Sequence, residues 1–199
     1  MIRSLHLIRH GETAWSLSGR HTGRTDLSLT KQGEQNALRL GERLRAIRFD
    51  RVFTSPRRRA LQTCELAGLG TSAAIDPDLA EWDYGDYEGL CTAEIHKARP
   101  AWNLFCDGCP GGEMPAQVSE RADRLLARLQ VLDGSIALFT HGHFGRVLAA
   151  RWVGLPLSSA RNFLFDPASR SILGYEHGDR TMPAIALWNA GGEQDRPPS

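Results

Sequence analysis

The chain has 199 residues, of which 41% are hydrophobic and 24% charged, as in globular proteins with a full-sized core. A formal net charge of +1 excludes a global electrostatic field that would attract nucleic acid or an anionic membrane. The sequence contains no signal-like apolar core and no membrane-spanning stretch, so we expect a cytoplasmic protein with reduced cysteines. Residues 1–190 are predicted to form a single domain and residues 191–199 a flexible tail.

Strand and helix patterns alternate along the sequence. Apolar runs predict the strands, and apolar residues spaced three or four apart predict the helices. Residues 11–26, 79–89 and 100–115 are expected to form loops, the last with a short helix around Trp102. In chain order, the predicted elements are a strand at 4–9, a helix capped by Thr30 and ending near Arg48, a strand at 51–55, a helix with Pro56 in its first turn, a short strand at 73–75, a helix at 118–131, a strand at 136–140, a helix at 144–153, and strands at 171–176 and 184–188.

This alternation predicts a three-layer α/β/α sandwich with a mostly parallel central sheet. Ligands of such sheets bind outside the carboxyl ends of the strands. His10, the segment 55–59 and His141 each follow the end of a predicted strand. We therefore expect these three polar clusters to meet in space.

Each cluster has a chemical interpretation and a structural alternative. A neutral imidazole at His10 can attack an anionic phosphorus centre while the Arg9 guanidinium carries the charge of the phosphate. An Arg–His pair can equally be structural. The arginines at 57–59 begin a predicted helix, where anions bind, although one or two of them are expected to face solvent. His141 leaves the most apolar strand, where a structural histidine is the alternative.

Two further segments carry reactive side chains. Residues 79–89 combine four carboxylates with three aromatic rings. A carboxyl beside aromatic surface and a bound phosphate would have its ionised form disfavoured, which suits a general acid; the alternative is an exposed acidic loop. Cys106 and Cys109 form a CxxC pair without a second pair, so we expect neither a metal site nor a redox motif.

Short motifs follow one another along the chain: Arg9–Thr13, Thr22–Gly23 with Leu29–Thr30 and Gly33, Ser55–Pro56 with Arg59–Ala60 and Gln62–Thr63, Glu81 with Gly85 and Glu88–Gly89, and His141–Gly142. Together they resemble the histidine phosphatase superfamily, which includes cofactor-dependent phosphoglycerate mutases. The resemblance implies that His10 is the nucleophile that becomes phosphohistidine and that Glu81 is the proton donor. It also implies a phosphate pocket formed by Arg9, Arg59 and His141. The residues that match positions lining the phosphate or substrate pocket further include Ser16, Thr22, Gly23, Tyr84 and Gly142.

The segments around Ser16, Glu81 and Asp107 are most similar to the branch of sedoheptulose-bisphosphatase-like enzymes and broad-range bacterial acid phosphatases. The expected function is a metal-independent, cofactor-free phosphomonoesterase that acts through phosphohistidine on small phosphorylated metabolites, such as sugar phosphates or bisphosphates. Arg20, His21 and His143 could add a second anion or hydroxyl site.

Two alternatives are a cofactor-dependent phosphoglycerate mutase and a non-catalytic phospho-ligand-binding module. Mutases usually have Asn in place of Ser16 and more residues between Gly89 and Val118, so this chain fits them less well. The chain retains all five residues to which the resemblance assigns catalytic roles, which argues against a module that has lost its activity. These residues are Arg9, His10, Arg59, Glu81 and His141. The expected partner is a small-molecule phosphate ester, with neither nucleic acid nor membrane, and the chain is expected to be a monomer or a homodimer.

Overall fold

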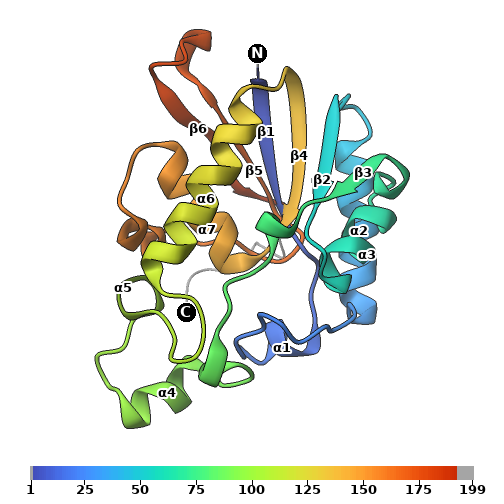
Figure 1. Ribbon diagram of the computed structural model, residues 1–199. Coiled ribbons are helices and arrows are strands. Elements are labelled where there is room, and N and C mark those ends of the chain that lie inside the picture. The colour runs from blue at the N-terminus through green and yellow to red at the C-terminus, as the bar shows by residue number, and fades with distance from the viewer. Residues whose placement is uncertain (1, 192–199) are drawn as a thin grey trace.

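A six-stranded sheet forms the centre of the protein in the computed structural model, which describes residues 2–191 (Figure 1). The strands are β1 (Ile2–Arg9), β2 (Arg51–Thr54), β3 (Ala73–Ile75), β4 (Gly134–Thr140), β5 (Arg170–Tyr175) and β6 (Pro183–Ala190). Their order across the sheet is β3-β2-β4-β1-β5-β6. The first four are parallel to one another, whereas β5 runs antiparallel to both of its neighbours. The sheet is therefore mixed and mostly parallel, as predicted.

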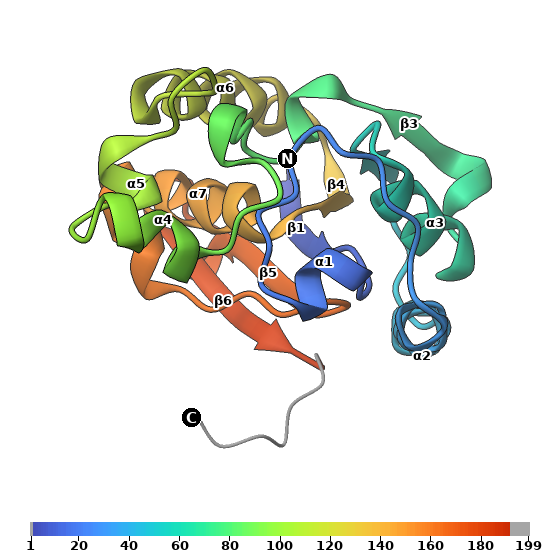
Figure 2. The same cartoon turned by 90° about the horizontal axis from the view of Figure 1, so that it is seen from below.

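Helices cover both faces of the sheet, so the predicted three-layer arrangement is confirmed (Figures 1 and 2). α2 (Lys31–Leu44) and α3 (Arg58–Leu66) lie on one face, and α6 (Pro115–Gln130) and α7 (Gly142–Trp152) on the other. Alternate residues of a strand serve opposite layers: Ile8 belongs to the core with α2 and α3, and Leu7 to the core with α6 and α7.

The start of α2 follows the prediction, but its end does not. The Thr30 hydroxyl accepts a hydrogen bond from the Gly33 N–H at 3.0 Å, which makes Thr30 the N-cap. The buried face contains Ala37, Leu40 and Leu44. The helix ends at Leu44 rather than near Arg48: the Ile47 N–H donates to the Leu44 carbonyl at 2.8 Å, which closes a turn before β2.

α3 begins two residues later than predicted. Pro56 was expected in its first turn, but Arg57 is the N-cap residue, with extended backbone at φ −77° and ψ 134°. The Ser55 hydroxyl accepts from the Arg57 N–H at 3.3 Å, and the Asp26 carboxylate accepts from the Arg58 N–H at 2.8 Å. These side chains satisfy the first amides in place of a helical turn.

Short elements lie beneath the carboxyl ends of the parallel strands (Figure 1). α1 (Ala14–Leu17) lies inside the segment predicted as a loop, and α4 (Thr92–Ala98) had no prediction. α5 (Leu104–Asp107) corresponds to the short helix expected around Trp102.

Brief 3-10 turns occur at several other places along the chain: Gly70–Ser72, Pro77–Leu79, Gly85–Tyr87, Leu157–Asn162 and Glu176–Gly178.

β2, β4 and β1 are direct neighbours and parallel, so the residues that follow them meet at the same end of the sheet, beyond the carboxyl ends of these strands. Ser55 follows β2, His141 follows β4 and His10 follows β1. Within residues 2–191, no helix combines the length and the apolar character that crossing a bilayer requires. Most of the predicted tail, residues 192–199, lies outside the described residues.

Candidate active site

His10 presents one free ring nitrogen. Its Nδ1 lies 2.7 Å from the carbonyl oxygen of Gly11, which can only accept, so Nδ1 carries the proton and the lone pair is on Nε2. Burial and then the Arg59 and Arg9 cations lower the pKa of His10 well below 6.5. The imidazole is thus neutral at neutral pH, with 4% of the residue exposed to the pocket.

The Arg9 guanidinium lies beside His10 with an unused donor. One of its Nη groups donates to the Phe165 carbonyl, but its buried Nε has no partner within residues 2–191. A Cβ at position 142 would lie 3.2 Å from Cζ of Arg9, so Gly142 leaves room for the guanidinium. A buried donor without an acceptor costs about 1–3 kcal/mol. The Arg9 side chain also lines the pocket, where its positive charge favours an anionic ligand.

Arg59 and His141 form a hydrogen-bonded chain behind His10. Arg59 Nε donates to His141 Nδ1 at 3.2 Å, so His141 carries its proton on Nε2, which lies 2.7 Å from the Ser55 hydroxyl. Both Arg59 and His141 are fully buried, and the imidazole centroids of His141 and His10 are 5.2 Å apart. Burial and then Arg59 lower the pKa of His141 well below 6.5. Of the three consecutive arginines, Arg59 is fully buried, Arg57 is half-buried and Arg58 is exposed.

The rest of the Arg59 guanidinium binds the loop that contains Thr22 and Gly23. Its Nη groups donate to the carbonyls of Thr22 at 2.8 Å, Gly23 at 3.2 Å and Thr25 at 3.1 Å. The Glu88 carboxylate accepts from the Gly23 and Thr25 N–H groups at 2.9 Å. The loop is therefore held between a cation and an anion. The sequence had identified Glu88 only as a motif position.

Glu81 caps the start of α7. Its Oε1 accepts from the N–H groups of Trp82 and Phe144, both at 2.9 Å, and its Oε2 accepts from the His143 N–H at 3.0 Å. The sequence predicted an aromatic setting for this carboxyl. The structure adds three backbone donors, which orient the carboxyl group toward the pocket that it lines.

A single pocket collects most of the predicted residues. Ser16, Thr22 and Tyr84 line it together with the groups described above, but the Ser16 hydroxyl is already bonded to the backbone of Thr13, at 2.9 Å to the N–H and 3.0 Å to the carbonyl. The lining residues that were predicted are Arg9, His10, Ser16, Thr22, Glu81, Tyr84 and Gly142, whereas Gly23, Arg59 and His141 lie behind its wall.

The far side of the pocket is cationic and aromatic. Tyr84 is buried, which raises its pKa well above 10, and its hydroxyl bonds Nδ1 of His143. This hydrogen bond joins Tyr84 and His143 into one polar group on the pocket wall. His21 stacks on Tyr84 at a centroid distance of 4.7 Å, and burial lowers the pKa of His21 to about 4. Arg20 completes this group, so all three residues expected at a second polar site line the pocket.

Arg146 also lines the pocket and was missed in the sequence. Its Nε donates to the Ala160 carbonyl at 2.9 Å and one Nη to the Arg161 carbonyl at 2.8 Å. Burial and then Arg9 lower the pKa of Arg146 to about 10, and we find no ion pair for it among the described residues. Arg146 lies four residues after Gly142, so the two residues share one face of α7. This spacing is the sequence signal that could have identified Arg146.

The CxxC pair contributes no ligand cluster. Cys106 is exposed in α5 and Cys109 is buried, and all four cysteines are free. Burial raises the pKa of Cys109 to about 12. No group of three or more His, Cys, Asp or Glu in the described part of the chain is arranged to hold a metal ion.

The fold and the site define an α/β enzyme that acts on phosphate esters, with a neutral imidazole among guanidinium groups at the carboxyl ends of parallel strands. A family model described as "Histidine phosphatase superfamily (branch 1)" matches residues 5–190. The chain belongs to this superfamily and is a phosphatase. The resemblance seen in the sequence is confirmed.

Two curated proteins and one solved structure illustrate this relationship. The acid phosphatase of Mycobacterium tuberculosis is 46% identical over 187 residues, covering 92% of each chain. The sedoheptulose 1,7-bisphosphatase of Saccharomyces cerevisiae is 41% identical over 214 residues, covering 91% of this chain and 77% of the yeast protein. The structure of an open reading frame from M. tuberculosis has a TM-score of 0.88 and 43% identity, covering 94% of this chain and 97% of that one.

Proposed function

We propose that this protein is a metal-independent phosphomonoesterase that works through a phosphohistidine intermediate on small phosphorylated metabolites. The observation that carries the proposal is the state of His10: a neutral ring, with its proton held on Nδ1 by Gly11 and its Nε2 free toward the pocket. A nitrogen lone pair beside the Arg9 cation is suited to in-line attack on a phosphorus atom.

In the first step, Nε2 of His10 forms a bond to phosphorus as the bond from phosphorus to the ester oxygen breaks. Arg9 neutralises charge on the phosphoryl oxygens, and the buried Arg59 adds its field from behind the pocket wall. Glu81 gives its proton to the departing alkoxide, which leaves as an alcohol.

In the second step, the Glu81 carboxylate takes a proton from a water molecule as the water oxygen attacks phosphorus. The N–P bond breaks, its electron pair returns to Nε2 of His10, and phosphate is released. Glu81 is protonated again. The one carboxyl group thus serves as acid and then as base, and two moderate barriers replace the single high barrier of uncatalysed monoester hydrolysis.

Chelation is expected to leave this activity intact, because guanidinium groups supply the charge stabilisation. The measurement is phosphate release from an alkyl phosphate before and after incubation with excess EDTA. A quenched reaction with labelled substrate should at the same time show an acid-labile, base-stable phosphate on the protein. Loss of activity that magnesium or zinc restores would contradict the proposal.

The far side of the pocket favours sugar bisphosphates over monophosphates. Arg146 brings a cation without an ion-pair partner in the described residues, and His143 and Arg20 add polar side chains to the same wall. These groups lie in the pocket that also contains Arg9 and His10, so a second phosphate on one small substrate would complement them. The match to a yeast bisphosphatase supports this inference.

Arg146→Met is expected to raise KM for a sugar bisphosphate on the order of tenfold or more, because a charge-assisted hydrogen bond contributes about 1.5–3 kcal/mol. For the corresponding monophosphate, KM should change by less than about twofold. Steady-state kinetics on both substrates measure the difference. Arg151→Met, on the same helix but outside the pocket, is the matched control. Equal effects on both substrates would assign Arg146 to the monophosphate site or to stability alone.

A mutase on this scaffold would have to return the phosphoryl group to a second hydroxyl before water reaches it. Incubation with 3-phosphoglycerate and its bisphosphate primer separates the two activities. We expect phosphate release and no accumulation of the isomeric phosphoglycerate.

A further inference from the structure

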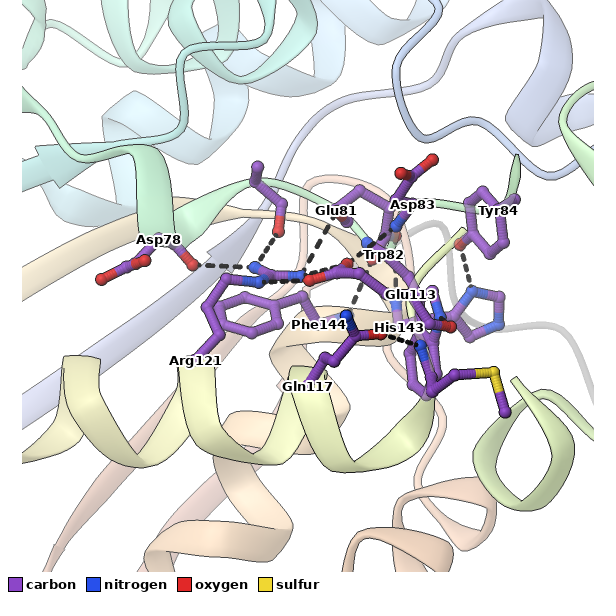
Figure 3. A network of polar contacts seen from close by, with 12 residues as sticks. Asp78, Glu81, Trp82, Asp83, Tyr84, Glu113, Gln117, Arg121, His143 and Phe144 are labelled. Atoms are coloured by element: carbon purple, nitrogen blue, oxygen red, sulfur yellow. Dashed lines mark hydrogen bonds and ion pairs between the residues drawn. The ribbon is translucent and has the colours of Figure 1, made fainter. Parts of the chain in front are cut away.

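An ion pair between the buried Arg121 and the half-buried Glu113 lies outside the pocket, behind Glu81. Arg121, on α6, is 9% exposed, and Glu113 precedes that helix. Arg121 Nε donates to Glu113 Oε1 at 2.9 Å, and one Nη donates to Oε2 at 2.8 Å (Figure 3). An ion pair that is largely withdrawn from water is weak evidence for stability, because desolvation of the charges offsets their attraction. Neither residue lines the pocket, so this pair needs another explanation.

The pair binds the backbone on both sides of Glu81. Arg121 donates to the carbonyls of Asp78 at 2.9 Å and Ala80 at 2.7 Å, and more weakly to that of Glu81 at 3.5 Å. The Glu113 carboxylate accepts from the Asp83 N–H at 2.9 Å. From Ala80 to Tyr84 the chain has no helix or strand, so these side chains replace the backbone partners that regular structure would provide.

Arg121 also reaches the residue that binds the Glu81 carboxyl group. Its guanidinium carbon lies 4.0 Å from the ring centroid of Phe144. The N–H of Phe144 in turn donates to Glu81 Oε1 at 2.9 Å. One guanidinium therefore touches both the segment that carries Glu81 and the start of α7 that receives its carboxyl group, as Figure 3 shows.

We propose that Arg121 and Glu113 are positioning residues for proton transfer, and that they hold the Glu81 carboxyl group at the distance and angle that the leaving oxygen requires. This inference rests on the proposed function, in which Glu81 is the general acid. Neither residue touches substrate. Their effect is specific to the step that uses the proton, because a small displacement of a proton donor weakens catalysis steeply.

The test compares two leaving groups in the phosphorylation step. An alkyl phosphate departs as a strongly basic alkoxide and needs the proton, whereas 4-nitrophenyl phosphate departs as a stable anion. Glu113→Gln and Arg121→Met should each slow single-turnover phosphorylation by the alkyl ester by on the order of tenfold or more, and by the nitrophenyl ester by less than about threefold. The control is Arg151→Met, which removes an exposed pair with Asp123 at 2.8 Å. It should leave both rates unchanged.

Thermal unfolding of each variant shows whether it folds. Arg121→Met leaves the Glu113 carboxylate unpaired; if that variant does not fold, Arg121→Lys supplies the measurement, since an ammonium keeps the charge but cannot form the bidentate pair and the carbonyl bonds together. Equal losses on both esters in folded variants would overturn the inference. Glu81→Gln is measured in parallel: if it shows no leaving-group dependence, the proposed role of Glu81 fails instead.

Discussion

Replacing His10 by alanine is expected to lower phosphatase turnover by on the order of 10⁴-fold or more, since removal of a covalent nucleophile abolishes the two-step route. Nε2 of His10 carries the lone pair that is free toward the pocket, because the Gly11 carbonyl holds the ring proton on Nδ1. The neighbouring His141 cannot replace it: that ring is fully buried between Arg59 and Ser55.

The measurement is phosphate release together with rapid quenching of labelled enzyme in mid-turnover. Wild type should retain an acid-labile, base-stable label that maps to His10, and His10→Ala should retain none. His177→Ala is the matched control, because His177 is an exposed histidine that does not line the pocket. Thermal unfolding should show that His10→Ala is folded. Full activity in that variant would refute the covalent mechanism.

Glu81→Gln is expected to slow phosphorylation by alkyl phosphates by about 10²–10⁴-fold, the usual cost of removing a general acid. The loss on 4-nitrophenyl phosphate should be much smaller, because its leaving group needs no proton. The amide cannot reproduce every bond of the carboxylate: its NH₂ group would face a backbone N–H, either that of His143 or those of Trp82 and Phe144. Some loss on both substrates is therefore expected from this misfit.

Single-turnover rates on the two esters separate the effect of losing the proton donor from the effect of the amide's poorer hydrogen bonding. Steady-state rates are less suitable, because slow dephosphorylation can mask the difference. Glu94→Gln is the control. Glu94 accepts from the Cys91 N–H at 2.8 Å at the start of α4, which resembles the capping role of Glu81 outside the pocket. Equal losses on both esters would make Glu81 an organiser of the phosphate site and would assign the proton to another group.

The order of elements and the end of the sheet at which the pocket lies follow from the sequence alone. Strand patterns, and an N-cap such as Thr30, depend on neighbours within a few residues, so they can be read locally. His10, Ser55 and His141 follow three parallel strands, and the geometry of a parallel sheet brings such positions together. The motifs around His10 and Glu81 identified the family for the same reason, because each is contiguous.

The finer arrangement required the tertiary structure. The late start of α3 depends on the Asp26 carboxylate, 32 residues from the amide it binds. The Glu81 carboxyl group receives N–H groups from α7, 62 and 63 residues away, and its segment is held by Arg121, about 40 residues away. The side chains that bind one another in these networks are separated by long stretches of sequence. No local pattern records such pairs, because they form only when the sheet has brought the helices and loops together.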